Sequence, residues 1–182
     1  MTAMGTADAE AAPVLPRVIV VMGVSGSGKT VVGSGLATAL GGRFAEGDRF
    51  HPSENIARMS AGMPLRDEDR WEWLDAIAVE IARAALDGEA LVVACSALKR
   101  IYRDRLRRAS PDLLFIHLDV DRDTAAARVG ARKGHFMPAS LIDSQFATLE
   151  LPGPDEIAVS FDGRRPVDEL VAEAAAALRV VI

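Results

Sequence analysis

The sequence predicts an α/β fold, a three-layer arrangement in which helices cover both faces of a parallel five-stranded sheet. Strand-like and helix-like segments alternate along the chain, as expected for right-handed crossovers between parallel strands. A glycine-rich stretch, residues 23–30, lies between the first apolar run and the first helical pattern. A chain of 182 residues, 49% hydrophobic and 26% charged, is long enough for one domain with a substantial core.

The strands are predicted at short apolar runs, and glycine, proline or polar breaks separate them from the helices. The predicted strands cover residues 17–22, 43–46, 91–95, 113–119 and 157–161. The predicted helices cover residues 30–40, 53–61, 67–86, a segment that ends near residue 109, residues 121–131 and 139–149, and a last segment that starts at Pro166. These elements predict one domain over residues 17–182, preceded by a flexible tail of residues 1–16.

Local signals mark several helix ends and faces. Gly41 and Gly42 stop the first helix, the hydroxyl of Ser53 is expected to cap the second, and Pro166 begins the last. The third helix opens with acidic residues, and its apolar face is predicted to consist of Trp71, Leu74, Ala78, Ile81 and Ala85. Both tryptophans of this helix are predicted to pack in a core or interface, because aromatic residues on helices usually do.

The glycine-rich stretch GVSGSGKT fits the pattern GxxxxGK[ST], a phosphate loop when it joins a strand to a helix. Its glycines let the backbone turn and approach an anion, and amides at a helix N-terminus point at phosphates. Lys29 is expected to reach the β- and γ-phosphates of a nucleoside triphosphate, and Thr30 to ligate the magnesium ion that bridges them. The predicted nucleotide-binding residues are Gly23, Val24, Ser25, Gly26, Ser27, Gly28, Lys29 and Thr30.

Two polar residues follow the second strand, at the edge where open α/β sheets bind ligands. Asp48 is the best candidate to accept a proton from an acceptor hydroxyl or to orient it, although an aspartate after a glycine also stabilises turns. His51 is expected to hydrogen-bond a polyol or to cap its helix. Metal binding by His51 is disfavoured, because no second His or Cys stands at ligand spacing.

The third strand ends at Cys95 without the aspartate that usually supports magnesium in phosphate-loop proteins. The outer magnesium role is therefore assigned to Glu46, at the end of the second strand. After Cys95, the candidates for a ligand role are Lys99, Arg100 and Arg103, and the arginine run of the following helix is predicted to be a solvated face. His117, inside an apolar run, is predicted to be packed and hydrogen-bonded.

Charge and cysteine content narrow the classes of protein. A net charge of −5 and a pI near 5.2 give no sign of an overall nucleic-acid footprint. Cys95 is the only cysteine, so an intramolecular disulfide is excluded, in agreement with a reducing cytoplasm. The N-terminus lacks a basic leader region, and no apolar run is long enough to cross a membrane. The sequence predicts a cytoplasmic protein without nucleic-acid or membrane partners.

A basic loop, residues 132–138, is punctuated by glycine and proline and precedes the sixth predicted helix. Such a loop is compatible with a mobile lid that brings Arg128, Arg132 or Lys133 onto the nucleotide. It is equally compatible with a simple turn, and the residues alone do not choose between the two.

Five stretches together resemble the gluconokinase family of phosphate-loop kinases. They are GVSGSGKT from Gly23, EGDRFHP from Glu46, PLRDEDRWEWL from Pro64, CSALKRIYRDRLR from Cys95 and ARKGHFMPASLIDSQFATLELP from Ala131. The resemblance covers nearly all of the chain from Arg17 onward. It implies ATP-dependent phosphorylation of D-gluconate at its terminal hydroxyl, with ATP and Mg2+ bound at the phosphate loop. It also implies the strand order 2-3-1-4-5 of nucleoside monophosphate kinases, a lid over about residues 131–138, and a homodimer.

The resemblance carries roles onto matching positions. Asp48 matches the second acid of the family's Asp-x-Asp stretch and is expected at the acceptor hydroxyl, whereas Glu46 stands where the family typically has aspartate. Arg128 resembles the arginine that packs against adenine, and Arg132 resembles the lid arginine on the phosphates, which favours the lid. The implied catalytic residues are Lys29, Asp48 and Arg132. Those implied on the gluconate side are Asp48, His51, Arg70, Ser96, Lys99 and His135, and either Arg70 or Lys99 is expected to meet the carboxylate.

The sequence disfavours other kinases, GTPases and a regulatory nucleotide-binding protein. Shikimate kinases share the phosphate loop, but a Gly-Gly-x-Gly stretch is expected where this chain has CSALK. Adenylate kinase-like enzymes need a nucleotide acceptor pocket, for which CSALK gives no reason. GTPase switches are disfavoured because their guanine-reading motif is missing. A regulatory protein that binds nucleotide without transferring phosphate is disfavoured by intact Lys29, Thr30 and Asp48.

Overall fold

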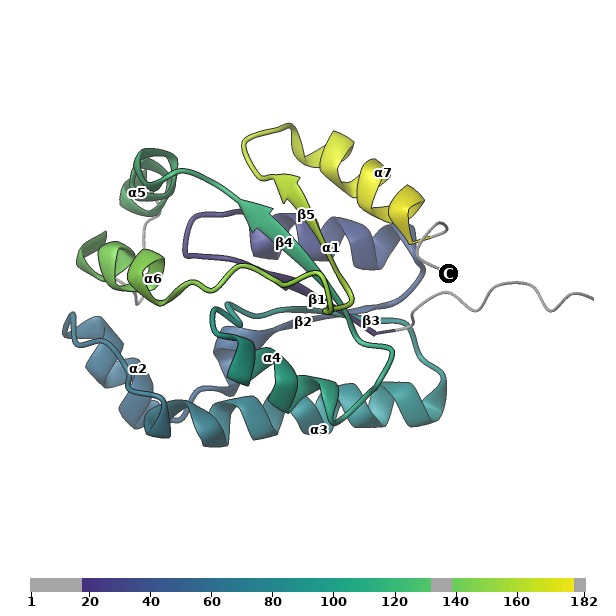
Figure 1. Cartoon of the computed structure of the whole chain (residues 1–182), viewed down its shortest axis with the longest axis horizontal. Helices are drawn as coiled ribbons and strands as arrows, with labels where there is room; N and C mark the ends of the chain where they lie inside the picture. The colour runs from purple at the N-terminus through teal and green to yellow at the C-terminus, as the bar shows by residue number, and fades with distance from the viewer. Residues whose placement is uncertain (1–17, 132–138, 179–182) are drawn as a thin grey trace, which may run out of the picture.

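The computed structural model describes residues 18–131 and 139–178. Its centre is a sheet of five parallel strands in the spatial order β2-β3-β1-β4-β5, with helices on both faces (Figure 1). The strands are β1 (Val18–Met22), β2 (Arg43–Glu46), β3 (Leu91–Ala94), β4 (Leu114–Asp119) and β5 (Ala158–Asp162). The predicted fold class and strand order are both confirmed.

The helices divide into three groups around this sheet (Figure 1). One face is covered by α1 (Lys29–Ala39) and α7 (Val167–Ala177), and the other by α3 (Trp71–Asp87) and α4 (Arg100–Arg107). At the carboxyl ends of the strands, on the left of Figure 1, stand α2 (Ser53–Ser60), α5 (Arg122–Ala131) and α6 (Ile142–Thr148). Short 3-10 turns are η1 (Gly47–Phe50), η2 (Glu68–Arg70) and η3 (Ala139–Leu141).

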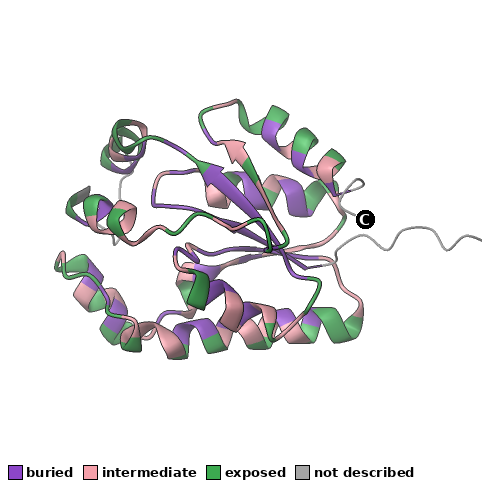
Figure 2. Ribbon diagram, in the orientation of Figure 1, coloured by how far each residue is buried: buried purple, intermediate pink, exposed green. Residues whose placement is uncertain are grey.

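The strand β1 is the buried centre of the sheet. It pairs with β3 on one side and β4 on the other, so that Val20 lies opposite both Val93 and Phe115. Successive side chains of a strand point to opposite faces. Val18, Val20 and Met22 accordingly enter the core under α3 and α4, whereas Ile19 and Val21 enter the core under α1 and α7. Figure 2 shows this burial along the middle of the sheet.

The buried face of α3 differs from the predicted one. Trp73 is fully buried, whereas Trp71 is only partly buried and Ala85 is exposed. The residues that α3 buries are Trp73, Leu74, Ile77, Ile81 and Ala84. Trp73 is the better core residue because its indole N–H finds a buried partner, the carbonyl of Gly47, at 2.8 Å. Both tryptophans do pack against the core, as predicted.

The predicted cap of α2 is wrong. Pro52 is the N-cap, Ser53 is the first helical residue, and no side-chain hydrogen bond caps this end. A contact in the first turn of α2 holds this end of the helix instead. The buried Asn55 donates a 2.6 Å hydrogen bond to the carbonyl of Asp69. This bond ties α2 to the turn η2.

The arginines of α4 are not simply a solvated face. Arg103 is fully buried and forms two hydrogen bonds with Glu156, of 2.7 and 2.8 Å. Arg107 reaches the same carboxylate at 2.6 Å. Burial alone would raise the pKa of Glu156, but the hydrogen bonds from Arg103 and Arg107 lower it to about 2. The prediction of a ligand role for Arg103 is therefore wrong, since its guanidinium joins α4 to the segment before β5.

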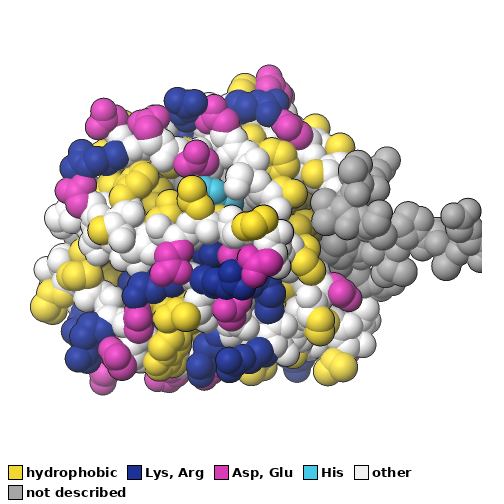
Figure 3. Space-filling model, viewed as in Figure 1, with side chains coloured by type: hydrophobic (Ala, Val, Ile, Leu, Met, Phe, Trp, Pro, Cys, Tyr) yellow, Lys and Arg dark blue, Asp and Glu magenta, His cyan; other side chains and the backbone are white. Residues whose placement is uncertain are grey.

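The remaining arginines of α4 pair with acids on the surface. Arg100 contacts Asp155 at 2.6 Å and Arg105 contacts Asp75 at 2.6 Å. Figure 3 shows Lys and Arg side chains interleaved with Asp and Glu on this face. His117 is buried, and its Nδ1 lies 3.3 Å from the hydroxyl of Ser160, which confirms the predicted packing. Within residues 18–131 and 139–178, every helix is too short or too polar to span a membrane.

Candidate active site

The phosphate loop joins β1 to α1 and depends on glycine at two positions. Gly26 and Gly28 adopt φ values of 81° and 100°, in the region where side chains are strained. A Cβ atom at Gly26 would also lie 2.6 Å from the carbonyl oxygen of Ala125. The loop is therefore pressed against α5, and only glycine fits this close approach.

A cavity of about 190 Å3 opens in front of the loop. Its walls combine the loop and the first turn of α1 with the end of β2 and with α5. The lining residues are Ser25, Gly26, Gly28, Lys29, Thr30, Val31, Glu46, Asp48, Arg128 and Val129. Backbone amides, a lysine and two carboxylates thus face one space, which suits a phosphate chain with its counter-cation.

The predicted magnesium pair is in contact. The hydroxyl of Thr30 donates a 2.6 Å hydrogen bond to Glu46 Oε2. The extra methylene of glutamate, relative to the family's aspartate, therefore does not prevent the carboxylate from reaching Thr30. In the part of the chain that is described, no group of three or more His, Cys, Asp or Glu side chains could hold a metal ion. A hydroxyl and one carboxylate fit a magnesium ion whose other ligands are phosphate oxygens and water.

The two cations at this cavity are held by backbone carbonyls. Lys29 Nζ donates to the carbonyl of Val24 at 2.9 Å. Arg128 Nη1 donates to Gly26 at 3.2 Å and to Gly163 at 2.9 Å. Arg128 therefore links α5, the phosphate loop and the turn after β5.

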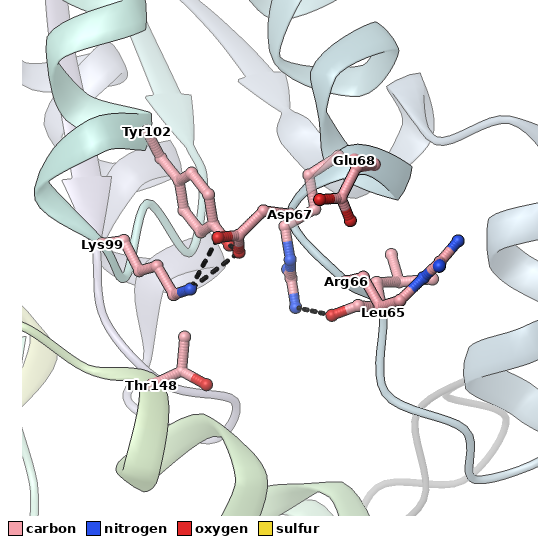
Figure 4. A pocket seen from close by; sticks show the side chains of 8 residues that line it. Leu65, Arg66, Asp67, Glu68, Lys99, Tyr102 and Thr148 are labelled. Carbon is pink, nitrogen blue, oxygen red and sulfur yellow. Dashed lines mark hydrogen bonds and ion pairs between the residues drawn. The ribbon is translucent and has the colours of Figure 1, made fainter.

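A second cavity, of about 330 Å3, lies between η2, α4 and α6 (Figure 4). Its lining is rich in charge and consists of Leu65, Arg66, Asp67, Glu68, Arg70, Lys99, Tyr102 and Thr148. Lys99 Nζ lies 2.8 Å from both carboxylate oxygens of Asp67, and the Tyr102 hydroxyl donates to the same carboxylate. The hydrogen bond from Lys99, followed by that from Tyr102, lowers the pKa of Asp67.

Arg70 also lines this cavity, and it is held differently from Lys99. Its Nη2 donates to the carbonyl of Leu65 at 3.2 Å, and its guanidinium lies 5.5 Å from the centre of the Tyr102 ring. Its Nε is buried and has no hydrogen-bond partner in the described part of the chain. Of the three cations that line the cavity, Lys99 is paired with Asp67 and Arg66 with Asp69, whereas Arg70 forms no ion pair within the described residues.

His51 lies within electrostatic reach of a charged residue of each cavity. Its ring stacks on Trp73, with centroids 4.2 Å apart and an interplanar angle of 13°. Burial is the main cause that lowers the pKa of His51 to about 4, while Asp48 raises it and Arg70 lowers it further. His51 is thus neutral at neutral pH. Its pKa is affected by Asp48, which lines the cavity at the phosphate loop, and by Arg70, which lines the second cavity.

The structure brings most of the predicted site residues together at the carboxyl ends of the strands. Asp48 lines the cavity at the phosphate loop with Lys29, and Arg70 and Lys99 line the other. Ser96 borders the phosphate loop, because its carbonyl accepts a 3.3 Å bond from the amide of Gly23. Arg132, His135 and most of the predicted lid lie outside the described residues.

Several residues that line these cavities or contact the phosphate loop were not predicted as site residues. The sequence predicts Asp67 only as one of the acids at a helix start, and it predicts no individual role for Tyr102. Tyr102 follows Lys99, the N-cap of α4, by three residues, and its amide donates to the carbonyl of Lys99 at 3.1 Å, so the spacing was a usable signal. Gln145 and Thr148 have the same spacing on α6. Gln145 contacts the phosphate loop, with 2.6 Å between Ser25 N and Gln145 Oε1.

The fold and the two cavities define a phosphate-loop kinase that acts on a small molecule. The family model for shikimate kinase matches residues 25–150. The chain is 48% identical over 158 residues to a gluconokinase of Gluconobacter oxydans, which covers 87% of this chain and 89% of that protein. The chain belongs to the gluconokinase family, within the wider group of kinases that the shikimate kinase model describes.

Solved structures agree with this membership. A sugar kinase from Janibacter sp. HTCC2649 superposes with a TM-score of 0.85 at 48% identity, covering 91% of this chain and 97% of that one. A gluconokinase from Sinorhizobium meliloti 1021 superposes with a TM-score of 0.82 at 49% identity, covering 92% and 94%. Both relatives match the chain over nearly its whole length.

Proposed function

We propose that this protein transfers the γ-phosphoryl group of ATP to the terminal hydroxyl of D-gluconate, giving 6-phospho-D-gluconate and ADP. The observation that carries the proposal is the pair of cavities at the carboxyl ends of the strands, one at a phosphate loop with Asp48 and one with cationic side chains, in a chain of the gluconokinase family. A polyhydroxy acid suits such a site, since it offers a hydroxyl at one end and a carboxylate at the other.

The nucleotide end of the site is proposed to use the loop amides and two side chains. The amides around Gly26 and Gly28 receive phosphate oxygens, and Lys29 neutralises the charge that grows on the phosphates during transfer. Thr30 and Glu46, which are 2.6 Å apart, are the residues that would hold Mg2+, and the ion would supply positive charge that stabilises the phosphates during transfer. Arg128 borders the same cavity and is proposed to pack against the base.

The acceptor end is proposed to use Asp48 at the reacting hydroxyl. As the hydroxyl oxygen bonds to the γ-phosphorus, its proton passes to the Asp48 carboxylate and the bond to the β-phosphate oxygen breaks. The electron pair of the broken bond stays on the β-phosphate oxygen, and ADP then leaves. His51, neutral and fixed by its stacking on Trp73, is proposed to hydrogen-bond a hydroxyl along the chain of the acceptor.

The far end of the acceptor is proposed to meet Arg70. Lys99 is already neutralised by Asp67 at 2.8 Å, whereas Arg70 has no carboxylate partner in the described part of the chain. A substrate carboxylate therefore gains more from Arg70 than from Lys99, which would first have to give up Asp67. The Lys99, Asp67 and Tyr102 group then offers a donor and an acceptor to sugar hydroxyls.

Three further properties are part of the proposal and rest on the family resemblance. They are a requirement for Mg2+, a homodimer and a location in the cytoplasm. Sedimentation of the purified protein at several concentrations tests the dimer, and titration of activity with free Mg2+ tests the metal requirement.

A coupled assay of ADP release across several acceptors tests the substrate. We expect turnover with gluconate well above that with shikimate, glycerate or AMP. Shikimate is the essential comparison, because the family model that matches residues 25–150 is the shikimate kinase model. Preferred turnover of shikimate would contradict the proposal, and nucleotide binding without turnover of any acceptor would favour a regulatory protein.

A further inference from the structure

The helix α6 is attached to the phosphate loop at two neighbouring positions. Its Ile142 and Phe146 belong to the apolar cluster that contains Val24 of the loop. The next loop residue, Ser25, lies with its backbone nitrogen 2.6 Å from Gln145 Oε1, so its N–H donates to the side-chain amide. A polar and an apolar contact therefore hold adjacent peptides of the loop.

The same helix also forms part of the second cavity. Thr148, three residues after Gln145, lines the cavity that contains Lys99 and Arg70. Just beyond the helix, the amide of Glu150 donates to Leu98 at 2.8 Å, and the carboxylate of Glu150 accepts from the amide of Arg100 at 2.7 Å. The end of α6 is thus fastened to the segment that carries Lys99.

We infer that Gln145 is a positioning residue for phosphoryl transfer, which holds the Ser25 peptide so that the phosphate loop is ordered before the nucleotide binds. This inference rests on the proposed nucleotide site and adds a residue to it. The loop needs such a restraint, because Gly23, Gly26 and Gly28 all have positive φ values and glycine orders at a high entropic cost. A loop that is already ordered binds its ligand more tightly, since less entropy is lost on binding.

The substitution Gln145→Met tests this role, because it keeps the length of the side chain and removes the amide oxygen. We expect the dissociation constant of ADP and the KM for ATP to rise by about tenfold, the usual effect of leaving a partly buried donor without its acceptor. The KM for gluconate is expected to change by less than about twofold, because Gln145 contacts the loop and not the second cavity.

Two further variants separate positioning from general loosening of α6. Asp143→Asn breaks the exposed ion pair of α6 with Arg122, at 2.5 Å, and leaves the loop contact in place. Gln145→Asn keeps the amide but is one methylene too short to reach Ser25, so it is expected to bind ADP as weakly as Gln145→Met. Asp143→Asn is expected to bind ADP like the wild type, even if its melting temperature falls.

ADP binding is measured by calorimetry on the full chain, with melting temperatures recorded for each variant. The inference is overturned if Gln145→Met or Gln145→Asn binds ADP as tightly as the wild type. It is also overturned if Asp143→Asn weakens ADP binding to the same extent. ADP binding needs no gluconate, so these outcomes stay distinct from a failure of the proposed acceptor.

Discussion

At the scale of single residues, the site depends on which charged groups already have partners. Lys99 and Asp67 neutralise each other at 2.8 Å, and Thr30 reaches Glu46 at 2.6 Å. Asp48 lines the cavity of the phosphate loop together with Lys29, without belonging to an ion pair in the described residues. A carboxylate in this position is suited to accept a hydrogen bond from an incoming hydroxyl.

Asp48→Asn keeps the shape of this side chain and removes its ability to accept a proton. If Asp48 orients the acceptor hydroxyl and receives its proton, kcat should fall by roughly two to four orders of magnitude. ADP binding should remain close to that of the wild type. A loss in kcat of less than about threefold would leave Asp48 as a turn residue.

Arg70→Met and Lys99→Met decide which cation meets the acceptor carboxylate. The measurement is the affinity of each variant for gluconate and for its neutral amide, gluconamide. Arg70→Met should lose roughly 10- to 150-fold for gluconate, the range for hydrogen bonds to charged groups, with a much smaller loss for gluconamide. Lys99→Met should weaken both ligands alike. The reverse pattern would assign the carboxylate to Lys99.

At the scale of elements, sequence patterns predicted the sheet well and the helix faces less well. Each strand was found because a short apolar run is bounded by breakers, and the glycine-rich loop has a pattern that few other structures use. The predicted buried face of α3 was wrong because Trp71 and Trp73 lie only two positions apart, and the helical period of apolar residues is compatible with burying either one. What selects Trp73 is a carbonyl of Gly47, which is remote in sequence.

The buried Arg103 illustrates the same limit. An arginine among several arginines on a helix is usually solvated, and only the fold brings Glu156 within 2.7 Å of it. The second cavity was likewise hidden, since Asp67, Tyr102 and Thr148 lie on three separate elements. By contrast, the placement of Glu46 and Asp48 was predictable because Glu46 ends a strand and Asp48 follows two residues later, and strand ends are where such sheets bind ligands.

The buried pair makes a prediction about stability. Glu156→Gln should lower the free energy of unfolding by about 3–5 kcal/mol at pH 7, because it leaves the fully buried Arg103 without its counter-charge. Denaturant unfolding measures the loss. The double variant Arg103→Met/Glu156→Gln is the control, and it should be more stable than Glu156→Gln because the fully buried charge is gone and Arg107 keeps its partner Asp104. Equal stability of the single variant and the wild type would contradict a structural role.

The same pair has a pH dependence with a definite sign. The pKa of Glu156 is about 2 in the folded protein, below its ordinary value of 4.5. Its contribution to stability is therefore complete above pH 4.5 and is lost as the pH falls from 4.5 towards 2. Glu156→Gln should flatten the stability profile across this window.

His51 contributes a pH dependence at higher pH. Its pKa is about 4 in the folded protein, below the ordinary histidine value of 6.5. The free energy of unfolding therefore falls as the pH drops from 6.5 towards 4.

At the scale of the whole molecule, the strand order creates the two-substrate site. Placing β1 between β3 and β4 sets the phosphate loop beside the segments that follow both strands. The neighbouring β2 then ends at Glu46, two residues before Asp48 and next to the loop cavity, while Lys99 is the N-cap of α4 after β3. The nucleotide and acceptor cavities are therefore neighbours because their parent strands are neighbours.

The central claim is that the two cavities hold ATP and gluconate for a direct transfer between them. Identification of the product by phosphorus–proton correlated NMR, after incubation with ATP, Mg2+ and gluconate, tests this claim most directly. We predict that the phosphate appears on the terminal carbon of gluconate, in amounts equal to the ADP formed. Release of inorganic phosphate with unmodified gluconate would contradict the account, because it would mean that no acceptor occupies the space beside Asp48.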